Sequence, residues 1–156
     1  MSGYFGIGVY HNKAEVNIGT LMRSAYQLGA AFVFTVGRRY RGEQSSDTYK
    51  TWRHIPLYHY ADMQELLASA PYSCPIVGIE MGGQDLAAFE HPQRCIYLLG
   101  AEDHGLPGSV LEDCYAVVSL QAVRQPSYNV AVAGSIVMYD RMAKAVTVKE
   151  GESREL

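Results

Sequence analysis

The chain has 156 residues, 48% of them hydrophobic and 19% charged, a size that buries one sizeable core, so we expect a single domain over 1–156. The formal net charge of −3 excludes a strongly basic protein, and any nucleic-acid site must therefore be a local patch. The three cysteines have no Cys-x-x-Cys spacing, which argues against a zinc site or a disulfide framework and favours reduced thiols in the cytoplasm. We find neither a signal segment nor an apolar run of about 18 residues, so we expect no export and no membrane partner.

Strand-like apolar runs recur along the chain, at residues 4–10, 30–36, 55–60, 75–80, 94–99 and 115–120. Between the first two runs, the residues from Ile18 to Leu28 have apolar side chains at helical spacing. Asn17 is the expected N-cap of this helix and Gly29 its expected C-cap.

Two further helices are predicted from the pattern. One covers residues 61–70, and a long helix-length segment rich in alanine and valine covers residues 126–146. The tail after about residue 146 is expected to be a frayed end. Strands that alternate with helices predict an α/β fold, with a mostly parallel sheet and helices on both faces.

A first short motif, Asn17-Ile-Gly-Thr-Leu-Met-Arg23, opens the first predicted helix. Backbone N–H groups at a helix N-terminus favour anions, and Arg23, six residues further on, projects from a different face than Asn17. Taken alone, the motif indicates no more than an N-cap and a surface arginine.

A second motif, Gly100-Ala-Glu-Asp-His-Gly-Leu106, follows the apolar run 94–99. Ligands of open α/β sheets gather where strands end. Gly100 and Gly105 would permit close approach of a flat ligand, and Glu102 supplies charge. A third motif, Ser127-Tyr-Asn-Val130, opens the last predicted helix, where Ser127 is explained as a plain cap.

Each motif is weak alone, but their combination and order resemble the SpoU branch of the SPOUT RNA methyltransferases. The motifs of that family read roughly N-x-G-x-x-x-R, G-x-E-x-x-G-[IL] and S-x-N-V, and the resemblance extends over about residues 4–145. One departure stands out, because Tyr128 replaces the usual leucine of the third motif.

The resemblance implies a C-terminal trefoil knot, a homodimer and S-adenosyl-L-methionine as cofactor. Matched by position, the residues implied in cofactor binding are Ile79, Glu80, Gly100, Glu102, Leu120, Ser127 and Asn129. The residues implied in catalysis are Arg23, Asn17, Glu102, Ser127 and Asn129. No metal is expected, since no cluster of residues has ligand spacing.

Methyl transfer to a ribose 2′-hydroxyl is the reaction that the resemblance implies. A guanidinium is effectively never deprotonated, so we expect Arg23 to clamp an RNA phosphate and to stabilise developing alkoxide charge, not to act as a base. Ser127 or the phosphate then takes the proton. Glu102 either adds negative potential near the sulfonium or orients Asn17 and Arg23. The site is expected to be composite, with Arg23 of one chain serving the cofactor of the other.

RNA contact is expected from a local basic stretch. Residues 37–54 hold cations interleaved with Tyr40, Tyr49 and Trp52, a mixture typical of surfaces that bind single-stranded RNA. The cations are Arg38, Arg39, Arg41, Lys50 and Arg53. The alternative is a solvated loop anchored by Trp52.

The favoured substrate is the wobble ribose in the anticodon loop of tRNA, because the chain resembles the minimal members of the family; ribosomal RNA is the alternative. A catalytically silent RNA-binding relative is an alternative of another class. A small hydrolase that uses Ser127 with His104 and Asp103 is disfavoured, since no G-x-S-x-G elbow surrounds the serine.

Overall fold

The structure is a computed structural model that describes residues 3–11, 13–40, 50–101 and 103–152. It contains one sheet of six strands in the order β3-β2-β1-β5-β4-β6, and all neighbouring pairs are parallel. The strands are β1 (Tyr4–Tyr10), β2 (Phe32–Val36), β3 (Leu57–Tyr60), β4 (Ile76–Asp85), β5 (Arg94–Leu99) and β6 (Ala116–Ser119). The predicted parallel sheet is confirmed.

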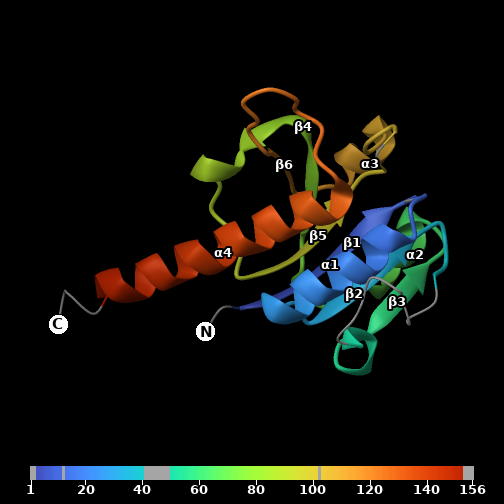
Figure 1. Cartoon of the computed structure of the whole chain (residues 1–156), viewed down its shortest axis with the longest axis horizontal. Helices are drawn as coiled ribbons and strands as arrows, with labels where there is room; N and C mark the ends of the chain where they lie inside the picture. The colour runs from blue at the N-terminus through green and yellow to red at the C-terminus, as the bar shows by residue number, and fades with distance from the viewer. Residues whose placement is uncertain (1–2, 12, 41–49, 102, 153–156) are drawn as a thin grey trace.

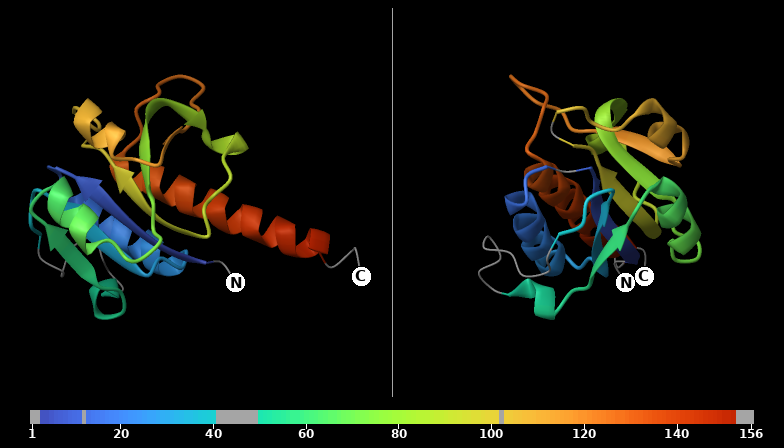
Figure 2. Two further views of the ribbon diagram at one scale, coloured as in Figure 1. Left: turned by 180° about the vertical axis from the view of Figure 1, so that it is seen from behind. Right: turned by 90° about the vertical axis from the view of Figure 1, so that its right-hand side faces the viewer.

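Helices cover both faces of the sheet (Figures 1 and 2). They are α1 (Val16–Gln27), α2 (Met63–Ser69), α3 (Gly108–Glu112) and α4 (Val130–Glu152), with short 3-10 turns η1 (Thr51–Arg53) and η2 (Leu86–Ala88). Apolar residues of α1 and α4, such as Leu21 and Met138, lie in one core cluster, and those of α2 and α3, such as Leu66 and Val110, lie in the other. The predicted coverage of both faces is therefore confirmed.

Helix α1 differs from the prediction at both ends. It begins at Val16 after Glu15, so Asn17 lies inside the first turn, and its predicted role as N-cap is wrong. The helix ends at Gln27 with Leu28 as C-cap, and Gly29 follows with a φ of 90°. The C-cap is therefore Leu28, one residue earlier than expected, and Gly29 supplies the left-handed residue that follows it.

Two other elements extend beyond their predicted limits. Strand β4 continues past Glu80 to Asp85, and its register against β6 shifts between Ile79 and Gln84. Helix α4 begins at Val130 and continues to Glu152, where we expected a helix over 126–146 and a frayed end after it. Helix α3 was not predicted. None of the helices in the described part of the chain is long and apolar enough to cross a membrane.

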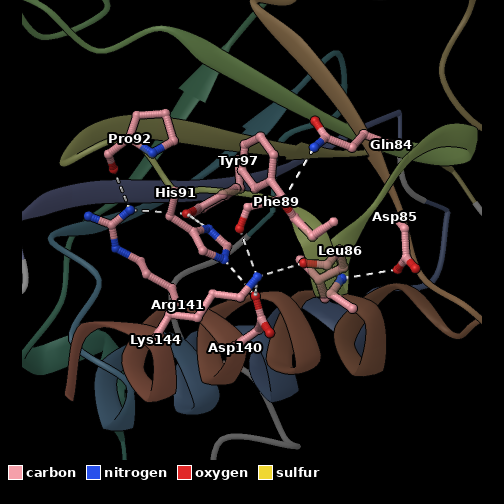
Figure 3. A network of polar contacts seen from close by, with 12 residues as sticks. Gln84, Asp85, Leu86, Phe89, His91, Pro92, Tyr97, Asp140, Arg141 and Lys144 are labelled. Carbon is pink, nitrogen blue, oxygen red and sulfur yellow. Dashed lines mark hydrogen bonds and ion pairs between the residues drawn. The ribbon is translucent and has the colours of Figure 1, made fainter. Parts of the chain in front are cut away.

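A buried polar network holds the middle of α4 against the amino-terminal edge of the sheet (Figure 3). Arg141, only 5% exposed, donates to the carbonyl oxygens of Pro92 (2.7 Å) and Gln93 (2.8 Å) and to the Tyr97 hydroxyl (3.1 Å). Lys144 donates to the carbonyl oxygens of Leu86 and Phe89, each at 2.7 Å. These contacts anchor the helix at its middle.

Candidate active site

A cavity of about 240 Å³ lies at the carboxyl edge of the sheet, where β5 and the buried part of β4 end. Its walls come from these strand ends, the loop after β5, the segment before α4 and the first turn of α4. Five of the seven residues predicted to bind the cofactor line it: Ile79, Glu80, Gly100, Leu120 and Ser127. Asn129 lies between two lining residues, Tyr128 and Val130, and Glu102 is outside the described residues.

The two glycines of the second motif are required by the packing of the loop itself. A Cβ on Gly100 would lie 2.5 Å from the backbone of Gly105, and one on Gly105 would lie 2.2 Å from the Glu80 carboxylate. Gly105 also has a φ of 62° and donates its N–H to Ala101 at 2.9 Å. Each glycine therefore permits a contact within the protein. Both also line the cavity, and their predicted role in the approach of a ligand stays a prediction.

Glu80 connects the end of the buried part of β4 to this loop. Its carboxylate accepts hydrogen bonds from the backbone N–H of Leu106 (2.6 Å) and of Met81 (2.9 Å). Two backbone donors satisfy a carboxylate that is half-buried and faces the cavity. Glu80 thus positions the second motif as well as lining the cavity.

The first and third motifs meet through two asparagines that are 112 residues apart in the sequence. The Asn129 side-chain amide donates to the amide oxygen of buried Asn17 at 3.0 Å. The amide oxygen of Asn129 accepts from the N–H groups of Ala131 (3.0 Å) and Val132 (3.2 Å), so Asn129 is the side chain that caps α4. The prediction that Ser127 is the cap is wrong. An amide suits this position because it donates and accepts at once.

Arg23 does not line the cavity of its own chain. It is half-buried on α1, six residues after Asn17, which places it about 9 Å further along the helix axis. The neighbouring Ser24 accepts a hydrogen bond from Ser135 of α4 at 2.8 Å, so this part of α1 lies against α4. The structure brings Asn17 to the third motif, whereas Arg23 is not among the residues that line the cavity.

Lys13 is a residue at the cavity edge that sequence reasoning missed. Its ammonium lies 2.8 Å from the carboxylate of Asp103, which lines the cavity, and Arg38 donates to its carbonyl oxygen at 3.0 Å. The hydrogen bond and charge of Lys13 lower the pKa of Asp103 below its usual range. Asp103 is therefore engaged with Lys13, and among the described residues no hydrogen bond joins Ser127 to His104, so the hydrolase alternative lacks a triad.

The four described cations of the predicted RNA-binding stretch lie at two different edges of the sheet. Arg38 and Arg39 follow the end of β2 at the cavity edge, whereas Lys50 and Arg53 precede β3 and so lie at the opposite edge. The guanidinium of Arg38 lies over the Tyr40 ring and that of Arg53 over the Trp52 ring, each at 5.2 Å. Arg41 is outside the described residues. No group of three or more potential metal ligands occurs within the described ranges.

Comparison with known proteins identifies the family. The model of the SpoU rRNA Methylase family matches residues 5–139. No curated protein matches the sequence. An AdoMet-bound rRNA methyltransferase from Sinorhizobium meliloti is 20% identical, with a TM-score of 0.81 over 92% of this chain and 57% of its own. The AdoMet complex of the SpoU methyltransferase AviRb from Streptomyces viridochromogenes is 21% identical, with a TM-score of 0.81 over 92% of this chain and 58% of its own.

The chain thus spans less than two thirds of the length of these two proteins. A third structure, described as giving insight into the 2-OH methylation of C/U34 on tRNA, is 19% identical, with a TM-score of 0.81 over 94% of this chain and 99% of its own. At such identities the structures show a common fold, and the family match covers most of the sequence. The chain belongs to the SpoU rRNA methylase family.

Proposed function

We propose that the protein is an S-adenosyl-L-methionine-dependent RNA methyltransferase that acts on a ribose 2′-hydroxyl. The cavity carries this proposal, because the second and third motifs, far apart in the sequence, both contribute residues to it, among them Gly100 and Ser127. Apolar side chains such as Ile79, Leu99 and Leu120 suit a flat adenine, and the Ser127 hydroxyl and loop backbone offer polar partners. When bound, the cofactor supplies an electrophilic methyl group.

The chain's own residues then serve the hydroxyl that attacks. A ribose hydroxyl is a poor nucleophile and needs positioning and charge stabilisation. Arg23 holds an RNA phosphate and stabilises the developing alkoxide, while Ser127 or the phosphate accepts the proton. The hydrogen bond between the side chains of Asn17 and Asn129, at 3.0 Å, holds the first and third motifs next to each other beside the cavity. The role of Glu102 near the sulfonium or toward Asn17 and Arg23 belongs to the proposal as well.

The favoured substrate is the wobble ribose of tRNA, with ribosomal RNA as the second candidate. In support, the chain matches nearly the whole length of the structure described for C/U34 of tRNA, whereas it matches only part of the rRNA methyltransferase. Mass spectrometry of ribose-methylated nucleosides, in tRNA and rRNA from cells with and without the gene, tests both. Loss of a modified nucleoside from rRNA alone would reject the tRNA assignment.

A catalytically silent relative would retain the fold without the cofactor. Calorimetry with S-adenosylhomocysteine in metal-free buffer separates this alternative from an enzyme. We expect saturable binding without added metal. Absence of heat and of thermal stabilisation at millimolar ligand would reject the methyltransferase proposal.

The active unit is a homodimer with a composite site, and the trefoil knot implied by the family remains part of this proposal. The separation of Arg23 from its own cavity supports a role toward the partner's cavity. Exposed apolar residues of α4, Val132 at 47% and Tyr139 at 60%, line a groove beside α1 that a second copy could cover.

Mixed dimers test the composite site. Arg23→Ala and Asn129→Ala should each be inactive, but a dimer with one of each would hold one intact site. Co-expression with two tags and random pairing should leave roughly a quarter of all sites intact, by twofold counting. Purified mixed dimers that stay as inactive as either parent would place Arg23 in its own chain's site.

A further inference from the structure

Tyr128, the departure from the third motif, lies in a loop that forms one wall of the cavity. This cavity loop, residues 120–128, connects β6 to α4 and is described along its whole length. In both ribbon views it arches beside the extended end of β4 (Figures 1 and 2). Leu120, Pro126, Ser127 and Tyr128 line the cavity.

The cavity loop has little backbone support. Residues 121–127 are all exposed, and Val123 is fully so. Within the described part of the chain, no backbone-to-backbone hydrogen bond outside helices and strands involves residues 120–128. An exposed loop without such bonds samples many conformations, and ligand binding must then order it at a cost.

The Tyr128 side chain closes this loop at its base. Its ring packs against the core cluster under α1 and α4, and its hydroxyl donates to the carbonyl oxygen of Gln121 at 2.6 Å, seven residues earlier. Among residues 120–128, all of which are described, this is the one hydrogen bond that joins two residues of the loop.

A second contact ties the closed loop to the sheet. The Gln121 side-chain amide donates to the Asp85 carboxylate at 2.7 Å, and the other oxygen of Asp85 accepts from Ala87 N–H at 3.0 Å. Asp85 is the last residue of β4 and the N-cap of η2, and Figure 3 shows it to the right of the polar network on α4. Core packing, the phenol and the Asp85 carboxylate form a continuous chain of contacts around the loop.

We propose that Tyr128 is a positioning residue whose hydroxyl latches the cavity loop and thereby sets the affinity for the S-adenosyl cofactor. The inference rests on the proposed function. A leucine at this position, usual in related motifs, would fill the apolar contact but could not hold the Gln121 carbonyl. The latch pre-orders the wall before the cofactor arrives, so its loss should weaken cofactor binding and leave the chemical step alone.

Tyr128→Phe is the sharpest test, because it keeps the ring and removes only the hydroxyl. We expect the Kd for S-adenosylhomocysteine and the KM for S-adenosyl-L-methionine to rise about three- to tenfold, as for loss of one hydrogen bond, with kcat at saturating cofactor unchanged. The NMR order parameters of the backbone of residues 121–127 in the ligand-free protein should fall. Tyr128→Leu should bind at least as weakly as the Phe variant.

Tyr115→Phe is the matched control, since Tyr115 is 70% exposed and does not line the cavity. It should leave binding and the order parameters of the loop as in the wild type. If Tyr128→Phe binds like the wild type, or loses only thermal stability, the latch is wrong. Weaker binding with unchanged order parameters of the loop would also overturn it. Failure of the wild type to bind S-adenosylhomocysteine would instead reject the proposed function itself.

Discussion

The two edges of the parallel sheet treat polar groups in opposite ways. At the amino-terminal edge, the buried groups of Arg141, His91 and Tyr97 are paired with one another and with carbonyl oxygens (Figure 3). At the carboxyl edge, Ser127 and the loop around Gly100 border a cavity. Helix α4 spans both edges. A rigid helix anchored at its middle holds its first turn, with Asn129, in place beside the cavity. The polar network at the amino-terminal edge therefore helps to position the residues of α4 that lie beside the cavity at the carboxyl edge.

Loss of the Arg23 side chain should impair catalysis without affecting the cavity or the polar network at the two edges of the sheet. Arg23→Ala should lower methyl transfer about a hundred- to thousandfold, as for removal of one donor to transition-state charge. Arg23→Lys should fail comparably, because a point charge cannot form a bidentate clamp. Affinity for S-adenosylhomocysteine should be nearly unchanged, since Arg23 is assigned to the RNA phosphate and does not line the cavity of its own chain. Single-turnover assays and calorimetry measure these effects, and near-normal turnover of the Lys variant would disprove the clamp.

Arg141→Met should disrupt the buried polar network at the amino-terminal edge of the sheet. The change leaves two carbonyl oxygens and the Tyr97 hydroxyl without their donor in the interior, so the free energy of unfolding should fall by about 3 kcal/mol. Urea denaturation measures the loss, and Arg94→Met, an exposed arginine at the same edge, is the control. Below its unfolding transition, the folded variant should still bind S-adenosylhomocysteine. A loss as small as that of the control would show that the network does not stabilise α4.

Glu80→Ala should affect stability and binding together. It removes the acceptor of the Leu106 and Met81 N–H groups, which should cost about 2 kcal/mol of stability. It also frees the second motif beside the cavity, so the Kd for S-adenosylhomocysteine should rise. Exposed Glu90 offers the matched control, Glu90→Ala. A loss of stability with an unchanged Kd for S-adenosylhomocysteine would show that the loop of the second motif does not contribute to cofactor binding.

His91 should make the stability of the protein depend on pH through the polar network at the amino-terminal edge of the sheet. Arg141 can only donate to the Tyr97 hydroxyl, so that hydroxyl can give its proton to His91 Nδ1 (2.6 Å) while Nε2 donates to Asp140 (2.8 Å). Burial lowers the pKa of His91 below 6.5, although Asp140 opposes the shift.

The unfolded chain therefore takes up this proton first as pH falls. Stability should decline from about pH 6.5 downward, by at most about 1.4 kcal/mol per unit, until the folded protein also protonates His91, and should not change above that range. Urea unfolding at several pH values measures this slope. His91→Gln should remove its contribution, and an identical slope in that variant would assign the acid sensitivity to other groups.

The smallest effect should come from the separated cations. Arg38→Ala with Arg39→Ala, at the cavity edge, should lower the slope of log RNA affinity against log salt by about 2, one unit for each lost phosphate contact. Arg53→Ala, at the other edge, should change it less. Equal changes in the salt slope would indicate that RNA contacts both edges. If neither change alters the slope, the alternative that residues 37–54 form a solvated loop is favoured.

Sequence patterns predict the regular elements well where burial is continuous. The runs around Val33 and Ile96 are strands because both faces of the sheet are covered, so neither face tolerates polar side chains. The end of β4 escapes prediction because Met81, Gly82 and Gln84 are exposed, and Gln84 pairs with β6 only after the register shift. Helix α3 has five residues, too few for periodicity to show.

The sequence by itself determined which segments are strands, where the motifs fall and that five of the thirteen Lys and Arg residues lie within residues 37–54. Tertiary structure alone decided that Asn129 contacts Asn17 and caps α4, that Gly105 makes room for Glu80, and that Arg38 and Arg53 lie at opposite edges. The physical reason is that strand and helix patterns depend on neighbours within a few residues. The partners of Asn129, Glu80 and Tyr128 depend on which distant segments the parallel sheet brings to its carboxyl edge.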